Sequence, residues 1–237
     1  MYAYYTIKMF LELLLRAVFP TSCLGCGRKT EKDLAICKDC LKSVKINDSF
    51  FCGQCHARLS APTKICHLDT PFILAAATNY RENEVIQKII RRFKFKHSDW
   101  VGKTLAEIIY PYARKIIPPE NLFICAVPLS ERRLQERGFN QAQVIANLIA
   151  PKLDLPILDS ALLRVKETKP QTLIHGLKNR KENLENAFWA DINKVKNKNI
   201  LLIDDVTTTG ATLHSVAKTL KSAGAKKIFA LVGAKAG

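Results

Sequence analysis

The chain has 237 residues, of which 48% are hydrophobic and 24% are charged. That content is too apolar for an intrinsically disordered protein, and the length suits one large domain or two unequal ones. The net charge of +16 favours a polyanionic partner, namely phosphate, nucleic acid or an anionic membrane surface, although a basic balance can also simply keep a protein in solution.

The segment before Pro20 is apolar but is interrupted by charges at Lys8, Glu12 and Arg16. This four-residue spacing places the charges on one face of a predicted helix. A signal-peptide core or a membrane-spanning helix would not carry three charges there. We therefore expect an amphipathic helix that packs on its own protein, with docking to a membrane surface as the alternative. We further expect no membrane span and a cytoplasmic protein whose thiols stay reduced.

Seven of the eight cysteines fall between Cys23 and Cys66, and six of them form three C-x2-C pairs. A C-x2-C turn presents two thiolates to one metal ion, and two such turns complete a closed, structural zinc site. The pairs Cys23/Cys26 and Cys37/Cys40 have the short spacing of a zinc ribbon, and we predict that they hold a structural zinc ion. The alternative to a functional role is that the ribbon only replaces a hydrophobic core.

A second candidate ribbon repeats this spacing but has an aspartate where a fourth cysteine would fall. Either a mixed ligand set binds a second zinc ion or this ribbon has lost its metal, and the spacing also allows pairing across the three turns. The candidate ligands are Cys52, Cys55 and Cys66, with Asp69, His67 or His56 as the fourth. The sequence thus predicts one or two structural zinc ions in a module over residues 1–70.

From Pro71 onward, short apolar runs alternate with segments of helical periodicity. Strands are expected at 72–80, 122–127, 161–165, 199–203 and 228–232, and helices at 84–95, 105–117, 140–150 and 211–223. The polar residues 166–186 predict a mobile loop that passes into a helix. This alternation predicts an α/β domain with a parallel sheet over residues 71–237, preceded by the small zinc-ribbon domain.

The most specific segment follows the predicted strand 199–203, where two carboxylates and a Thr/Gly turn precede a helix. Ligands of α/β sheets bind at this end of the strands, and free N–H groups at a helix start favour phosphate. Adjacent carboxylates can accept hydrogen bonds from two ribose hydroxyls and influence a nearby magnesium ion. The alternative is an ordinary N-cap beside a solvated turn. The acids are Asp204 and Asp205, and the loop comprises Thr207, Thr208, Thr209, Gly210, Ala211 and Thr212.

These residues resemble the motif by which type I phosphoribosyltransferases bind PRPP (5-phosphoribosyl 1-diphosphate). The resemblance implies that the paired acids hold the ribose, that Mg²⁺ accompanies PRPP, and that the Thr/Gly loop holds the 5-phosphate. Most of the chain, moreover, resembles the ComF competence family, although Asp69 departs from that family's usual double zinc ribbon. The segments that carry this resemblance are the Cys pairs, the run from Arg132-Arg133 to Arg137-Gly-Phe-Asn140-Gln141, Pro170-Gln171, Arg180, Asn183 and Ala187-Phe188.

Two groups of basic residues are candidates for binding polyanions. The first is interleaved with Phe93 and Phe95, so that cations could grip phosphates while rings stack on the bases of single-stranded DNA. The alternative is a solvated helix face for the cations, with Ile89, Ile90 and Phe93, and Phe95 as a further candidate, facing the core. The second group would face a pyrophosphate, or else pair with nearby glutamates. The first group comprises Lys88, Arg91, Arg92, Lys94 and Lys96, and the second Arg132, Arg133, Arg137 and Lys169.

The family resemblance implies a cytoplasmic factor of natural transformation that binds PRPP with Mg²⁺ and handles single-stranded DNA beside a ComFA-like helicase. One alternative is a working phosphoribosyltransferase that transfers phosphoribose to an amine or a nucleobase. Another is a PRPP sensor without turnover. The sequence assigns no catalytic residue and no segment dedicated to an acceptor.

Overall fold

The computed structural model describes residues 22–30, 34–61, 64, 66–67, 69–95, 98–117, 121–165 and 187–237. Three sequence predictions lie outside these residues: the amphipathic helix before Pro20, the loop at 166–186, and the basic candidates Lys96 and Lys169.

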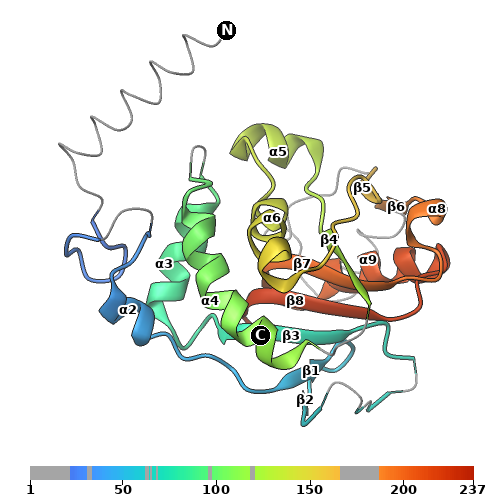
Figure 1. The fold of residues 1–237 in the computed structure, drawn as a ribbon, viewed down its shortest axis with the longest axis horizontal. Coiled ribbons are helices and arrows are strands. Elements are labelled where there is room, and N and C mark those ends of the chain that lie inside the picture. The colour runs from blue at the N-terminus through green and yellow to red at the C-terminus, as the bar shows by residue number, and fades with distance from the viewer. Residues whose placement is uncertain are drawn as a thin grey trace, which may run out of the picture.

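A six-stranded sheet forms the centre of the molecule, in the order β2-β1-β3-β8-β7-β4 (Figure 1). The four strands from β3 to β4 are parallel, and β1 pairs antiparallel with both β2 and β3. Two further strands, β5 (Leu162–Arg164) and β6 (Phe188–Ala190), form a separate antiparallel pair. The strands of the main sheet are β1 (Phe50–Cys52), β2 (Arg58–Leu59), β3 (Ile73–Asn79), β4 (Leu122–Ala126), β7 (Asn199–Thr207) and β8 (Ile228–Lys235).

Helices cover both faces of this sheet. One face carries α3, α4 and α6, and the other carries α9 together with the β5–β6 pair. The helices are α2 (Lys38–Lys42), α3 (Glu84–Phe93), α4 (Val101–Ile116), α5 (Glu131–Arg137), α6 (Gln141–Leu153), α8 (Ile192–Val195) and α9 (Ala211–Ser222).

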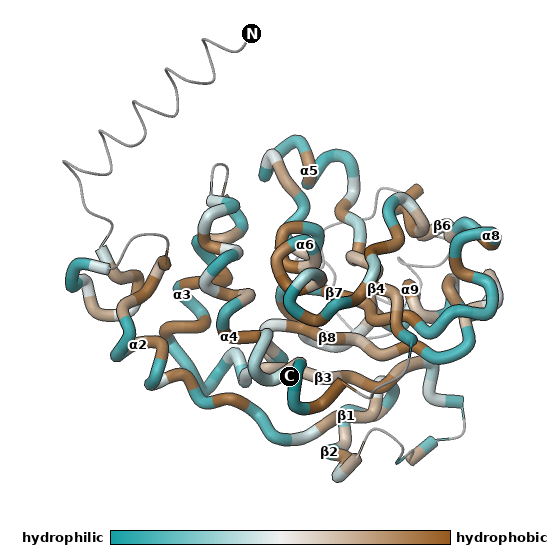
Figure 2. Tube along the Cα trace, viewed as in Figure 1, coloured by the Kyte–Doolittle hydropathy of each residue, from teal (hydrophilic) through white to brown (hydrophobic). Residues whose placement is uncertain are grey.

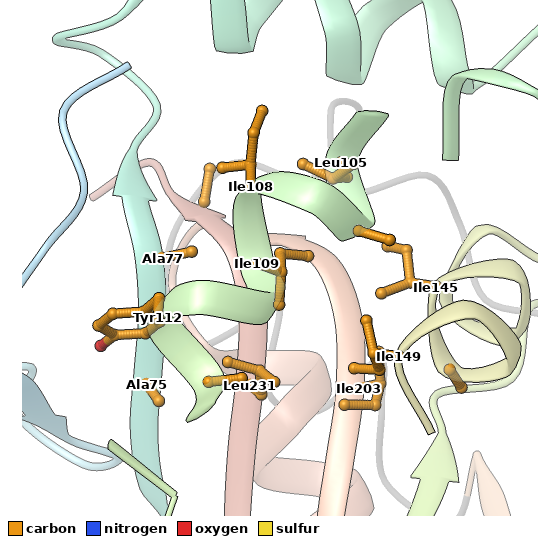
Figure 3. Packing of buried hydrophobic residues seen from close by; sticks show 14 of the residues in the cluster. Ala75, Ala77, Leu105, Ile108, Ile109, Tyr112, Ile145, Ile149, Ile203 and Leu231 are labelled. Carbon is orange, nitrogen blue, oxygen red and sulfur yellow. The ribbon is translucent and has the colours of Figure 1, made fainter. Parts of the chain in front are cut away.

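A hydrophobic core lies on each face of the sheet, and the one under α4 is the larger. Ile109 of α4 is fully buried between Leu231 of β8 and the α6 residues Ile145 and Ile149 (Figure 3). The small residues of β3, among them Ala77, leave room for α4 to approach the sheet. Because strands β7 and β8 are covered on both faces, nearly all of their residues are buried, as expected for a doubly covered parallel sheet.

The predicted fold class, an α/β domain with a mostly parallel sheet, is confirmed. The strand bearing the acids is longer than predicted, because Val206 and Thr207 continue the pairing with Ala234 and Lys235. Helix α5 was not predicted, since none of its residues is buried and apolar periodicity is therefore missing. Figure 2 shows α5 as largely hydrophilic, in contrast to the hydrophobic strands of the sheet.

The predicted boundary at residue 70 falls within one continuous sheet. Strands β1 and β2 come from the Cys-rich part of the chain, and β1 pairs with β3 from Phe50↔Ala75 to Cys52↔Ile73. The first ribbon also contributes Ala35 and Ile36, both fully buried, to the core under α3 and α4. Among the described residues, no helix combines the length and the apolar character that crossing a bilayer requires.

Candidate functional site

The two predicted acids lie in the C-terminal half of β7. Asp205 is 7% exposed, and Asp204 is half-buried. Each carboxylate accepts a hydrogen bond from the backbone N–H of the next residue. Oδ1 of Asp204 accepts from the N–H of Asp205 at 2.9 Å, and Oδ1 of Asp205 accepts from the N–H of Val206 at 2.8 Å. These bonds fix both side chains near the carboxyl end of the parallel strands, where α/β sheets bind their ligands.

One oxygen of this acid pair is buried without a hydrogen bond. Oδ2 of Asp205 accepts none from the described residues, and the ammonium of Lys94 lies 3.9 Å away from it. Burial, together with the neighbouring charge of Asp205, raises the pKa of Asp204 well above its usual value. A ligand that supplies hydroxyl donors or a cation would offset both costs, because buried carboxylates need partners.

The predicted phosphate loop connects β7 to α9. Gly210 is the N-cap of α9 with φ +68°, and no side chain caps the helix there. The first N–H groups of a helix have no partner inside it and attract anions. Oγ1 of Thr209 is likewise buried without a hydrogen-bond partner among the described residues. The loop therefore offers backbone and hydroxyl donors to a phosphate beside the acid pair.

Of the predicted pyrophosphate arginines, Arg137 lies where the charges of both acids act on it. It is half-buried, its Nη1 donates to Oε1 of Gln141 at 2.8 Å, and the charges of Asp205 and Asp204 act on its guanidinium. Burial lowers the pKa of Arg137, and the negative charges of Asp205 and Asp204 partly oppose this shift. Arg132 instead forms an exposed ion pair with Glu136 at 3.3 Å, the alternative that the sequence left open.

Lys94 was predicted among the DNA-binding residues, but the structure brings it to the pocket. It caps the C-terminus of α3, where Nε2 of Gln141 donates to the carbonyl of Phe93 at 3.1 Å and so ties α3 to α6. This tie directs Lys94 towards Asp205. Sequence spacing contains no signal for this placement, because it depends on how α3 packs against α6.

The remaining residues of the first basic group divide into two kinds. Lys88 donates to the carbonyl of Gly25 at 3.1 Å and so supports the first ribbon, whereas Arg91 and Arg92 are exposed. Phe93 is fully buried, with its ring centroid 5.5 Å from that of Phe139, but Phe95 is 62% exposed. The core alternative therefore holds for Phe93, and Phe95 remains available for stacking.

The first four cysteines come together as predicted. The sulfurs of Cys23, Cys26, Cys37 and Cys40 all lie within 4.8 Å of one another. A Cβ on Gly25 would lie 2.6 Å from Sγ of Cys40, so only glycine fits this turn. The N–H groups of Cys26 and Cys37 point at Sγ of Cys23, at 3.5 and 3.3 Å, as in a turn shaped to present thiolates.

The second cluster gathers Cys52, Cys55 and Cys66 with His67. His67, rather than Asp69, is the fourth side chain: its Nδ1 lies 3.1 Å from Sγ of Cys66 and 3.6 Å from Sγ of Cys52. The hydroxyl of Thr70 lies 3.5 Å from Sγ of Cys52 and supports the cluster from outside. The sequence offered Asp69, His67 and His56 as the fourth ligand, and their spacing alone did not decide between them.

The thiols of both clusters have opposed ionisation behaviour. Hydrogen bonding from Arg28 lowers the pKa of Cys26 to about 6, while burial and the adjacent thiols raise that of Cys40 to about 12. Burial raises the pKa of Cys52, but hydrogen bonds from the N–H of Cys55 and from the Thr70 hydroxyl outweigh it and give a value of about 5. A divalent cation offsets thiolate repulsion, so that both donor sets fit structural zinc.

Comparison with known proteins agrees with both parts of this arrangement. The phosphoribosyl transferase domain matches residues 140–236, and the double zinc ribbon domain matches residues 14–68. Competence protein F of Haemophilus influenzae is 31% identical over 226 residues, which cover 89% of this chain and 95% of that protein. The chain belongs to the ComF competence family.

Two other relatives of this ComF protein carry related names. Competence protein ComFC of Bacillus subtilis is 29% identical over 81% of this chain and 80% of its own length. The DNA utilization protein YhgH of Escherichia coli is 27% identical over 87% of this chain and 86% of its own length. Competence and DNA utilization are therefore the recurring themes among its relatives.

Proposed function

We propose that this ComF protein acts in natural transformation as a cytoplasmic factor that binds PRPP with Mg²⁺ and handles single-stranded DNA. The observation that carries the PRPP part is the buried Oδ2 of Asp205, which lacks a hydrogen bond among the described residues. Two ribose hydroxyls are the donors that would satisfy the acid pair, and the 5-phosphate would then meet the N-terminus of α9.

The chain's own residues divide the ligand between them. Asp204 and Asp205 would orient the ribose and, when Mg²⁺ accompanies PRPP, hold it close to the diphosphate. Arg137 and Lys94 flank the acids on the side of α3 and α5, and supply positive charge for that diphosphate. The Thr207–Thr212 loop supplies neutral donors for the 5-phosphate.

The DNA part rests on charge, on one exposed ring and on the names of the relatives. Helices α3 and α5 rise on the same side of the sheet (Figure 1). Arg91, Arg92 and Phe95 are exposed at the end of α3, so that backbone phosphates and one stacked base could bind there. A ComFA-like helicase would deliver the strand, as the family resemblance implies.

Calorimetric titration of the full chain with PRPP and Mg²⁺ tests the pocket. The double variant Asp204→Asn with Asp205→Asn keeps the side-chain volumes and should weaken PRPP binding at least 100-fold, because each amide removes a negative charge and replaces one acceptor oxygen with a donor NH2 group. Asp159→Asn, at an exposed position, is the matched control and should bind like the wild type. Unchanged PRPP affinity in the double variant would show that PRPP does not bind at this pocket.

The same titration in the presence of a short single-stranded oligonucleotide tests the link to DNA. PRPP affinity that the oligonucleotide alters supports a role in DNA handling. PRPP affinity indifferent to DNA, together with release of pyrophosphate on addition of amines or nucleobases, would instead favour a working phosphoribosyltransferase.

A further inference from the structure

The turn that follows the third Cys-x2-Cys pair, Cys52/Cys55, reaches the phosphate loop. A Cβ placed on Gly210 would lie 2.9 Å from Nε2 of His56 and 3.4 Å from its Cε1, so the imidazole rests directly on the N-cap of α9. His56 itself has φ +62°, and its N–H donates to the carbonyl of Cys52 at 3.0 Å. The conformation of this zinc-ribbon turn thus determines where the imidazole lies.

A second basic side chain belongs to the same neighbourhood. Lys235 lies beside Thr207 in the register of β8 and β7, and the N–H of the next residue, Ala236, donates to the carbonyl of Thr207 at 2.8 Å. The ammonium of Lys235 lies 5.2 Å from the ring centroid of Phe51, close enough to His56 for its charge to act on the imidazole.

Neither side chain has an anionic partner among the residues that the structure describes. Within the described part of the chain, the side-chain nitrogens of His56 and Lys235 form no hydrogen bond or ion pair, although both residues are half-buried. Two nitrogen donors therefore converge on a loop whose Thr209 hydroxyl is also unsatisfied. Half-buried donors at such a position are available to a ligand that accepts hydrogen bonds from them, and the buried Thr209 hydroxyl needs such a partner.

We propose that His56 and Lys235 are additional ligands of the phosphate that binds at Thr207–Thr212, so that the second zinc ribbon forms one wall of the phosphate site. This inference rests on the proposed function and adds a residue from outside the transferase-like part of the chain. The ligand chemistry is a phosphate monoester, carried either by the ribose of PRPP or by the 5′ end of a DNA strand. A neutral imidazole suffices, because it still donates one N–H.

The proposal has a consequence for the second metal cluster. His56 directly follows Cys55 and closes the turn that begins at Cys52, and both cysteines belong to the cluster. Zinc at this cluster would therefore fix the imidazole over Gly210, and phosphate affinity should depend on the zinc content of the second ribbon but not on that of the first.

The test uses the full, zinc-loaded chain and two small probes. Ribose 5-phosphate reports on the phosphate loop, and pyrophosphate reports on the Arg137 side of the pocket. We expect His56→Ala and Lys235→Met each to weaken ribose 5-phosphate binding about tenfold, with pyrophosphate affinity and zinc content unchanged. Lys226→Met, at an exposed lysine, is the matched control for the charge and should have no effect.

The outcomes separate this inference from the proposed function. Wild-type binding of ribose 5-phosphate that neither variant alters would overturn the inference and leave the PRPP pocket intact. An equal loss of ribose 5-phosphate and pyrophosphate binding would also overturn it, because it indicates a collapsed pocket. A wild-type chain that binds neither PRPP nor ribose 5-phosphate would disprove the proposed function as well. If the same variants weaken the binding of a 5′-phosphorylated oligonucleotide, the phosphate belongs to a DNA end.

Discussion

The two zinc ribbons share the spacing of their first three ligands but differ in the fourth ligand and in their surroundings. The first docks on α3 and α4, where Lys88 donates to Gly25 and the hydroxyl of Thr104 accepts from the N–H of Ala35 at 2.6 Å. The second runs into strand β1 of the main sheet and touches the phosphate loop through His56. Sequence spacing therefore specifies a metal ligand set, whereas the packing around it decides whether the metal supports the core or a binding site.

The largest effect is expected from the first ribbon. Replacing Cys23 and Cys26 by Ser should release one zinc ion per chain and expose the core residues Ala35 and Ile36, because structural zinc contributes on the order of 10 kcal/mol to such modules. Metal analysis and limited proteolysis would detect both changes. A variant that stays fully folded without this zinc would contradict the structural role.

The second ribbon should behave differently when it loses its metal. Replacing the exposed Cys55 and Cys66 by Ser should release the other zinc ion but leave the β1–β3 pairing in place, because Phe50 and Cys52 remain buried in the sheet. We expect about a tenfold loss of ribose 5-phosphate affinity by calorimetry. If the two double variants affect ribose 5-phosphate equally in their soluble, folded fractions, the contrast between the ribbons is wrong.

The smallest expected effect tests the contact between His56 of the second ribbon and Gly210 of the loop. Gly210→Ala should lower the free energy of unfolding by about 1 kcal/mol through its positive φ alone, and further through the clash with His56. In the background of His56→Ala the clash is absent, so only the backbone cost should remain. Denaturant titrations of the four proteins give this coupling, and strictly additive losses would show that the imidazole does not rest on Gly210.

The elements with strong apolar patterns were predicted closely, and the site residues on them followed. Strand 199–203 and the helix after it placed the acids and the Thr/Gly loop together, because a buried parallel strand followed by a turn leaves few arrangements. Helix α5 was missed because none of its residues is fully buried, so that no apolar periodicity marks it. Lys94 and His56 were missed as pocket residues because their positions result from contacts between segments far apart in the sequence.

The place of β8 in the sheet also bears on how the chain assembles. This strand follows all the others in sequence, yet it lies between β3 and β7 and pairs with both. Without β8, the strands β2-β1-β3 and the pair β4–β7 would be two separate pieces of sheet. The central pairings of the sheet therefore join segments that lie far apart in the sequence, a topology whose folding is typically slow because long loops must close before the strands pair.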